Sequence, residues 1–186
     1  MAGAAVLVPV KGFGRAKLRL APVLDPAARA QLARRMAERV VRSAAGLPVW
    51  VVCDDPEVAD WAAGLGAAVV WEPGRGLNGA VDAGVRHLGA AGHRLVVVAA
   101  GDLPLADDLG WVADFDGVTL VPDRRRDGTN VIGVPPLAGF AFAYGPGSYA
   151  RHLSEARRLG LAVRVVSAPR LAWDVDLPED LEVVTA

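Results

Sequence analysis

Short apolar runs alternate along this chain with segments of helical periodicity. The apolar runs that we expect to form strands are Ala4–Val10, Val49–Cys53, Ala67–Trp71, Leu95–Ala100, Val118–Val121, Gly139–Ala143 and Leu161–Val166. Several of them are rich in valine and continuous rather than alternating, which is typical of strands buried on both faces of a mostly parallel sheet.

The segments between these runs carry helix signals. Asp25 followed by Pro26 predicts an N-cap and a proline in the first helical turn. Leu32, Met36 and Val40 then recur at every fourth position and form an apolar stripe. Further helices are expected at Asp55–Gly64, Asn78–Ala91, Leu105–Phe115 and Gly147–Leu159.

Strands that alternate with helices of this length predict a single-domain α/β/α sandwich over residues 1–186, with a mostly parallel sheet. The stretch Pro122–Pro136 lacks helical periodicity and contains turn signals, so we expect a long loop or hairpin over the sheet. Ligands of such folds collect at the carboxyl ends of the strands. Residues that bind ligands or take part in catalysis are therefore expected directly after the apolar runs.

Composition narrows the class of protein. Of 186 residues, 53% are hydrophobic and 22% charged, which excludes a disordered chain or a coiled coil. No apolar stretch approaches the roughly 18 residues that a transmembrane helix needs. The formal net charge of -1 gives no overall field toward nucleic acid or an anionic membrane. Cys53 is the single cysteine, so no internal disulfide forms, and a reduced cytoplasm is the expected location.

A cationic, glycine-containing loop follows the first apolar run. The stretch Lys11–Arg19 contains four cations in nine residues. Gly12 and Gly14 allow the backbone to approach an anion, while Lys11, Arg15 and Lys17 supply positive charge. The loop lacks the third glycine of a dinucleotide motif and the Lys-Ser/Thr of a Walker A motif. We interpret it as a phosphate-binding loop; the alternative is a basic surface loop.

Carboxylates stand at two later positions suited to a metal. Asp102 follows the Leu95–Ala100 run, and Asp174 and Asp176 lie near the carboxyl end of the chain. A magnesium ion bound to a nucleotide takes only one or two protein carboxylates, because it keeps waters and uses phosphate oxygens. We expect these aspartates to be ligands. The alternative is that Asp102 and Asp176 each cap a following helix.

Two further segments could hold a small anion. Thr129 lies in an Arg-Asp-Gly-Thr-Asn stretch, and Gly145–Ser148 precedes a predicted helix. Free amides and the dipole at a helix start favour phosphate or carboxylate, and the Thr129 and Ser148 hydroxyls would add donors. The alternative for Gly145–Ser148 is a plain turn and N-cap.

No catalytic base suggests itself. The three histidines, His87, His93 and His152, lie in or beside helical segments without ligand spacing, and we interpret them as structural. Transfer of a phosphoryl or nucleotidyl group to a phosphate needs no strong base, because the acceptor oxygen is already anionic. It needs charge neutralisation and in-line positioning instead.

Six motifs in order resemble one family. The stretches PVKGFGRAKLRL, GLNGAV, GDLPL, RDGTNV, YGPGSY and DVDLPEDL are similar to those of the CofC/FbiD family. These are the phosphoenolpyruvate or 2-phospho-L-lactate guanylyltransferases of coenzyme F-420 (deazaflavin) biosynthesis. The resemblance runs from the first strand to about Leu181. It implies the GT-A/MobA-like fold of sugar-phosphate and molybdopterin nucleotidyltransferases.

The resemblance also implies roles for residues. It assigns the GTP triphosphate to the Lys11–Lys17 loop, with Lys17 and Asp102 catalytic. It assigns the guanine side to Gly76, Leu77 and Asn78, and magnesium to Asp102, Asp174 and Asp176. It assigns the acceptor acid to Thr129, Gly145 and Ser148. The implied partners are GTP, phosphoenolpyruvate or a similar small phosphorylated acid, and the next enzyme of the pathway, to which product could be handed.

Other functions stay open at this point. A molybdenum-cofactor or sugar-phosphate nucleotidyltransferase would keep the class of reaction and change the acceptor. A glycosyltransferase of the same architecture would place its Asp-x-Asp after a mid-chain strand, whereas here the pair Asp174 and Asp176 is near the carboxyl end. A GTP-binding module without catalysis is a third alternative. Among acceptors, phosphoenolpyruvate is expected ahead of 2-phospho-L-lactate and 3-phosphoglycerate.

Overall fold

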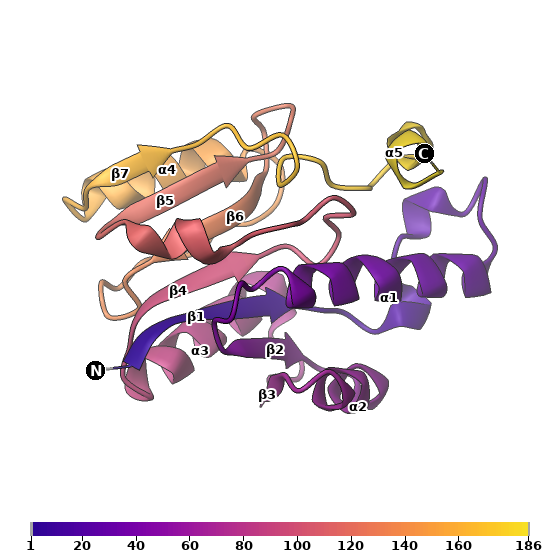
Figure 1. Ribbon diagram of the computed structural model, residues 1–186. Helices are drawn as coiled ribbons and strands as arrows, with labels where there is room; N and C mark the ends of the chain where they lie inside the picture. Colours follow the sequence, from indigo (N-terminus) through magenta and orange to yellow (C-terminus); the bar gives the residue numbers. More distant parts are fainter. Residues whose placement is uncertain (1, 186) are drawn as a thin grey trace.

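The computed structural model describes residues 2–185 as one seven-stranded sheet with helices on both faces (Figure 1). The strands are β1 Ala2–Pro9, β2 Val49–Cys53, β3 Ala68–Trp71, β4 His93–Ala99, β5 Val118–Pro122, β6 Thr129–Val134 and β7 Val163–Val165. The α-helices are α1 Pro26–Arg42, α2 Pro56–Gly64, α3 Gly76–Ala90, α4 Ser148–Arg158 and α5 Glu182–Thr185. Short 3-10 helices are η1 Phe13–Arg15, η2 Leu18–Leu20, η3 Gly110–Asp114 and η4 Pro178–Leu181.

The strand order places the ends of distant segments at one edge of the sheet. The order is β3-β2-β1-β4-β6-β5-β7, with β6 antiparallel to both of its neighbours. The parallel strands β1 to β4 therefore end at the same edge. Because β6 runs the other way, its first residue, Thr129, begins at that edge, beside the end of β4. The amide of Ala100 accordingly donates to the Asn130 carbonyl at 2.8 Å.

The alternating faces of the strands supply two apolar layers. Val6 and Val8 of β1 point to the layer formed with α1 and α2, whereas Leu7 points to the layer formed with α3 and α4. All three are fully buried. A sheet buried on both faces explains the continuous valine-rich runs of the sequence. The predicted α/β/α sandwich with a mostly parallel sheet is confirmed.

Most predicted elements are present, with ends that shift by at most two residues. The predicted start of the first long helix is confirmed, because the Asp25 carboxylate accepts a hydrogen bond from the Ala28 amide at 2.7 Å and Pro26 is the first helical residue. The predicted strand Gly139–Ala143 is wrong. Side chains of α4 take backbone amides there: Ala141 donates to Glu155, and Ala143 donates to His152. Those amides are thus not available to a strand ladder.

The predicted helix Leu105–Phe115 is also wrong, because only the 3-10 turn η3 forms within it. The carboxylates of Asp107 and Asp108 accept hydrogen bonds from the amides of Asp108 and Gly110, at 2.9 and 2.7 Å. Such local side-chain bonds compete with helical ones. The amide of Leu109 is held in addition by the carbonyl of Ser43, in the turn after α1.

The stretch Pro122–Pro136 forms a hairpin, which is one of the two structures predicted for it. It belongs to the sheet, however, and does not lie over it, because β6 pairs with β4 and β5. The β-branched residues Val131, Ile132 and Val134 are completely buried between neighbouring strands and helices. That run is typical of a central strand, whereas the turn residues on either side of it favour a loop.

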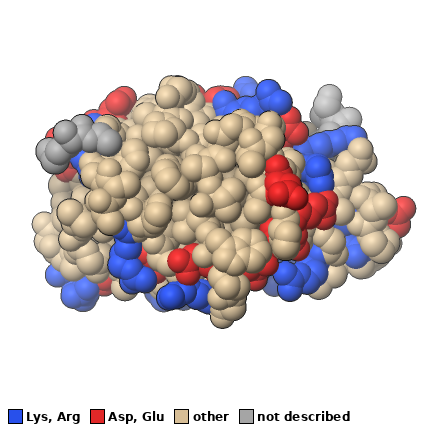
Figure 2. Space-filling model, turned by 90° about the horizontal axis from the view of Figure 1, so that it is seen from below, with Lys and Arg blue, Asp and Glu red and all other residues tan. Residues whose placement is uncertain are grey.

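The surface carries charges of both signs. On the side of the molecule next to edge strand β3, Lys and Arg lie among Asp and Glu and do not form a broad field of one sign (Figure 2). Among the described residues, no helix is long and apolar enough to cross a bilayer.

The carboxyl-terminal segment is tied to the sheet by one buried carboxylate. The side chain of Asp180 is 1% exposed and is ion-paired with Arg124, which follows β5. It also accepts hydrogen bonds from the amides of Asp176 and Leu177, at 2.8 and 2.7 Å. Burial alone would raise the pKa of Asp180, but the Arg124 guanidinium and the two amides outweigh it and lower that pKa. Asp180 therefore fixes the course of residues 174–177.

We predict that Asp180→Ala lowers the free energy of unfolding by about 2–4 kcal/mol, because it leaves Arg124 and two amides without their acceptor. Chemical denaturation measures this loss. The matched control is Glu179→Ala: Glu179 is 62% exposed and lies 3.8 Å from Arg125. Its removal should change stability by no more than about 0.5 kcal/mol. Equal stability of the two variants would contradict the anchoring role of Asp180.

Candidate functional site

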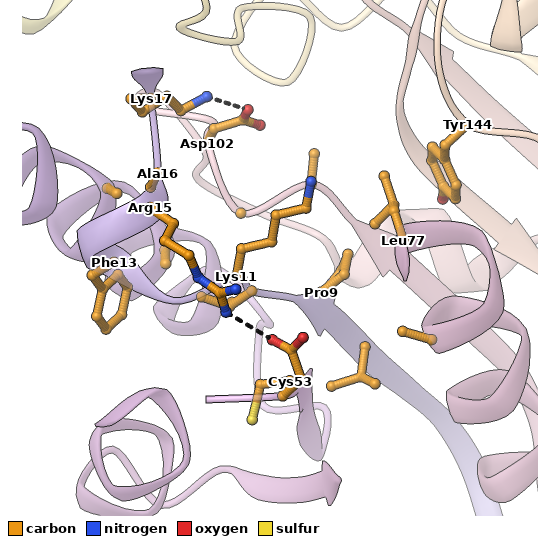
Figure 3. A pocket seen from close by; sticks show the side chains of 18 of the residues that line it. Pro9, Lys11, Phe13, Arg15, Ala16, Lys17, Cys53, Leu77, Asp102 and Tyr144 are labelled. Atoms are coloured by element: carbon orange, nitrogen blue, oxygen red, sulfur yellow. Dashed lines mark hydrogen bonds and ion pairs between the residues drawn. The ribbon is translucent and has the colours of Figure 1, made fainter. Parts of the chain in front are cut away.

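A cleft of about 700 Å³ opens at the edge where β1 to β4 end. Figure 3 shows Lys17 and Asp102 on one side of it, Leu77 and Tyr144 on the other, and Lys11 between them. Its polar or charged walls come from Lys11, Arg15, Lys17, Arg19, Asp54, Glu72, Asp102, Thr129, Tyr144 and Asp176. We call this the strand-end cleft.

The centre of the charged side is the ammonium group of Lys17. It lies 2.6 Å from an oxygen of Asp102 and 3.1 Å from an oxygen of Asp176. The three residues come from the turn after β1, the end of β4 and the carboxyl-terminal segment, and they are separated by 85 and 159 positions along the chain. The predicted meeting of cationic loop and metal-type carboxylates is thus present in the fold.

Backbone geometry and burial both direct Lys17 inward. Its φ of 53° is left-handed, an uncommon conformation for a residue with a side chain, and it separates η1 from η2. The side chain is only 11% exposed. Burial alone would lower the pKa of Lys17, but the charges of Asp102 and Asp176 outweigh it and raise that pKa. Lys17 is therefore a permanent cation between two carboxylates.

Asp174 lies behind this pair and outside the cleft lining. Its carboxylate is 3.4 Å from the side-chain nitrogen of Asn130, at the start of β6. Burial, and then the nearby charge of Asp102, raise the pKa of Asp174. The carbonyl of Asp102 accepts a hydrogen bond from the Val175 amide at 3.3 Å, which holds the two acidic segments together.

The helix-capping alternatives for these aspartates do not hold. No helix follows Asp102 directly, since η3 begins only at Gly110. Before η4 it is Asp180, and not Asp176, that accepts from the neighbouring amides. The carboxylates of Asp102 and Asp176 are thus left for a cation, and Lys17 occupies that position.

This donor set fits a metal that is brought in with a nucleotide. Within residues 2–185 no three acidic, histidine or cysteine side chains already form a metal-binding group. A preformed three-carboxylate cage is therefore not present. Asp102 and Asp176 nonetheless face one shared cation, the Lys17 ammonium. Two carboxylates around one positive charge match what a nucleotide-bound divalent ion takes from protein.

Two other strand ends carry carboxylates that the sequence analysis did not select. Asp54 follows β2 and lies 3.7 Å from the Arg15 guanidinium, and Glu72 follows β3 and pairs with Arg75 at 2.7 Å. Both line the strand-end cleft. The rule that selected Asp102, a carboxylate directly after a buried strand, would have found them as well.

The cationic loop lies partly on the cleft wall. Lys11, Arg15 and Lys17 line it, whereas Gly12 and Gly14 do not. Gly12 is required for packing: a Cβ there would lie 2.3 Å from an Asp55 carboxylate oxygen at the start of α2. Gly14 is exposed, with open space where a Cβ would point. Phosphate binding is therefore indicated by the three cations of the loop and not by its two glycines.

The start of α3 forms the apolar side of the cleft. Gly76 and Leu77 line it, as the resemblance implies. Asn78 is not among the lining residues. Its side-chain oxygen accepts from the Tyr144 amide at 2.6 Å, and its nitrogen is 3.4 Å from the Tyr144 carbonyl. In this conformation Asn78 joins α3 to the segment that holds Tyr144.

Of the expected acceptor residues, Thr129 lines the cleft, while Gly145 and Ser148 are not among its lining residues. The Ser148 hydroxyl accepts from the Thr129 amide at 3.0 Å. The expectation of free amides at the start of α4 is wrong for two of them. The Ser148 amide donates to the Gly145 carbonyl, and the Tyr149 amide donates to the Asp127 carbonyl. Side-chain hydroxyls are thus the better donors here.

Taken together, the cleft places cations, two carboxylates and hydroxyl donors around a space large enough for a nucleotide. Fixed charges of this kind stabilise negative charge that develops on transferring phosphate oxygens, and no group in the arrangement has to act as a strong base. The arrangement is suited to displacement at phosphorus.

Comparisons with known proteins identify the fold and the family of the chain. A solved structure titled as a nucleotidyl transferase from Methanothermobacter thermautotroptrophicus superposes with a TM-score of 0.69, over 98% of this chain and 95% of that one, at 20% identity. This likeness shows the fold. The chain is 40% identical to the phosphoenolpyruvate guanylyltransferase of Rubrobacter xylanophilus over 184 residues, which cover 94% of this chain and 90% of that protein.

A second relative has the same name. It is the phosphoenolpyruvate guanylyltransferase of Chloroflexus aggregans, 36% identical over 95% of this chain and 94% of that protein. The family model for CofC-like guanylyl transferases matches residues 4–185. The chain therefore belongs to the CofC-like guanylyl transferase family, which is a family of nucleotidyltransferases.

Proposed function

We propose that this protein transfers GMP from GTP to the phosphate of phosphoenolpyruvate and releases pyrophosphate. The observation that carries the proposal is the contact of Lys17 with both Asp102 and Asp176 inside the strand-end cleft. Relatives named for this reaction cover nearly the whole chain. We further propose a role in coenzyme F-420 biosynthesis, from the family resemblance, and a cytoplasmic location, from the single cysteine.

The charged side of the cleft supports a place for the triphosphate. Lys11, Arg15 and Lys17 all line the cleft, and Lys17 contacts Asp102 there. Arg19 adds a fourth cation, 3.9 Å from Asp176. Polyphosphate needs several positive groups, and lysine and arginine bind phosphate oxygens well. The guanosine then extends toward the apolar side, where Gly76 and Leu77 begin α3.

The acceptor acid occupies the side of the cleft where β6 begins. Thr129 is the hydroxyl donor that lines it, the Thr129 amide donates to the Ser148 hydroxyl, and the Ser148 amide donates to the Gly145 carbonyl. A small acid with a phosphate and a carboxylate suits this side, because it needs few donors and little volume. The relatives that cover nearly the whole chain are named for phosphoenolpyruvate, which argues against the molybdenum-cofactor and sugar-phosphate alternatives.

The reaction is a direct displacement. A phosphate oxygen of phosphoenolpyruvate attacks the α-phosphorus of GTP, and the bond from that phosphorus to the α,β-bridging oxygen breaks. Pyrophosphate leaves with the electron pair, and a GMP–phosphoenolpyruvate anhydride forms. The attacking oxygen is already anionic, so no proton has to be removed. Lys17 holds positive charge next to the reacting phosphates throughout.

Nucleotidyltransferases generally use a divalent cation, and we assign magnesium to Asp102 and Asp176, with Asp174 behind them. When bound, magnesium would neutralise charge on the substrate phosphates and the leaving pyrophosphate. Lys17 stands at the position of that cation and would move toward the phosphates as the nucleotide arrives.

One assay tests the proposed function. The purified protein is incubated with magnesium, each of four nucleoside triphosphates and each of three acids: phosphoenolpyruvate, 2-phospho-L-lactate and 3-phosphoglycerate. We expect pyrophosphate release with GTP and phosphoenolpyruvate, dependent on both. Release with 2-phospho-L-lactate alone would move the protein to the other acceptor of the family. No release with any pair would leave a GTP-binding module.

We predict that Asp102→Asn lowers kcat/KM by about 10²-fold or more, because it removes a charge needed in the transition state. Circular dichroism and the melting temperature should stay close to those of the unaltered protein, which separates this effect from misfolding. The control is Asp107→Asn, an exposed carboxylate past the same strand that pairs with Arg170. Normal turnover by Asp102→Asn would remove it from the catalytic site.

We also predict that Lys17→Met makes magnesium a stronger stabiliser. Without the ammonium, Asp102 and Asp176 repel each other, so the magnesium-free variant should melt below the unaltered protein. Added magnesium should restore the variant and raise its melting temperature more than that of the unaltered protein. Lys11→Met, which removes an exposed cation from the same cleft, is the control. An equal response of all three proteins would contradict a cation site between these carboxylates.

A further inference from the structure

A buried histidine, His152 on α4, lies directly behind the acceptor side of the cleft. It has no solvent exposure, and aromatic rings of Phe140, Phe142 and Tyr144 surround it. Both of its ring nitrogens are within hydrogen-bond distance of a partner. Nε2 is 2.9 Å from the Ala143 amide nitrogen, and Nδ1 is 3.0 Å from the Thr129 hydroxyl oxygen.

The partners determine which nitrogen carries the proton. A backbone amide can only donate, so Nε2 of His152 accepts from Ala143. In a neutral imidazole the hydrogen is then on Nδ1, which donates it to the Thr129 hydroxyl oxygen. Burial, and then the charge of the neighbouring Arg151, lower the pKa of His152 to about 4, so the ring is neutral near pH 7. The tautomer is therefore fixed by geometry.

This tautomer leaves the Thr129 hydroxyl as a donor. Its oxygen already accepts from His152, so its own hydrogen is available for another acceptor. Thr129 is only 5% exposed, yet it lines the strand-end cleft. The Ser148 hydroxyl oxygen accepts from the Thr129 amide, which leaves the Ser148 hydrogen free in the same way. Donors are what an anionic acceptor requires.

We propose that His152 is a positioning residue that holds the Thr129 hydroxyl as a hydrogen-bond donor toward an anionic oxygen of the acceptor acid. This rests on the proposed function, which puts that acid next to Thr129. His152 does not touch the acid and exchanges no proton during the reaction. Its effect is on acceptor affinity, since a donor fixed in advance loses no rotational freedom on binding.

Two substitutions of His152 separate positioning from mere support of the loop. In His152→Asn the side-chain amide nitrogen stands near the place of Nδ1 and can still donate to Thr129. In His152→Gln the amide oxygen reaches the place of Nε2 and can still accept from Ala143. Both remove the ring from the aromatic cluster, so they form a matched pair with respect to packing.

We expect His152→Gln to raise KM for phosphoenolpyruvate about tenfold and to leave KM for GTP within about twofold. His152→Asn should keep KM for phosphoenolpyruvate within about threefold of the unaltered value. Steady-state pyrophosphate release with each substrate varied in turn measures both constants. If the two variants change KM for both substrates equally, His152 only supports the fold and the proposal is wrong.

A double-mutant cycle with Thr129→Val tests whether His152 acts on acceptor binding through the Thr129 hydroxyl. If His152 acts through the Thr129 hydroxyl, His152→Gln should change KM for phosphoenolpyruvate less than twofold once that hydroxyl is gone. The same tenfold effect in both backgrounds would overturn the proposal. Unaltered protein that releases no pyrophosphate with phosphoenolpyruvate would instead refute the proposed function, and with it the basis of this inference.

A measurement on the unaltered protein covers the case in which the variants fail to fold. Long-range ¹H–¹⁵N NMR of the imidazole of His152 reports the protonated nitrogen directly. We expect a neutral ring with its proton on Nδ1 at pH 7. A proton on Nε2, or on both nitrogens, would contradict the hydrogen-bond direction on which the inference depends.

Discussion

The arrangement of this site depends on one largely buried cation between two carboxylates. Lys17 joins the turn after β1 to the end of β4 through Asp102 and to the carboxyl-terminal segment through Asp176. These segments are far apart in sequence, and like charges of the two aspartates would separate them without a cation. The same contact brings together the groups that a metal-bound polyphosphate needs. The Lys17 ammonium can bind phosphate oxygens, and the two carboxylates can bind the metal.

A second ion pair, whose carboxylate is fully buried, holds the segment that carries Asp176. Asp180 and Arg124 fix the carboxyl-terminal segment to the end of β5, and the amide of Asp176 is held by the same carboxylate. Stability and function are thus coupled in this segment, since the side chain that anchors it lies four residues from one that faces Lys17. On the opposite side, hydrogen bonds from α3 and α4 to residues 143 and 144 hold the acceptor side in place. The two substrates would meet between these two anchored regions.

Much of the fold was predictable because burial on both faces produces continuous valine-rich strands, and strand ends then locate the cleft. Lys17 and Asp102 were found by that rule, whereas Asp176 was found by its pairing with Asp174 near the carboxyl end of the chain. The errors arose where side chains replace backbone partners. The side chains of Glu155 and His152 accept hydrogen bonds from amides that a strand over residues 139–143 would need for its ladder. The carboxylates of Asp107 and Asp108 likewise accept from amides within the predicted helix Leu105–Phe115. His152 could have been flagged only by its position four residues after Ser148, on the same face of α4.

The central claim is that Lys17, Asp102 and Asp176 meet around one triphosphate. Its most direct test is a crystal structure with manganese and a GTP analogue whose α,β-bridging oxygen is replaced by a methylene group. Anomalous scattering then locates the metal independently of the ligand. The account predicts manganese at Asp102 and Asp176 in contact with the α-phosphate, with the Lys17 ammonium on a phosphate oxygen. A triphosphate on another face of the molecule, or a metal away from these aspartates, would contradict it.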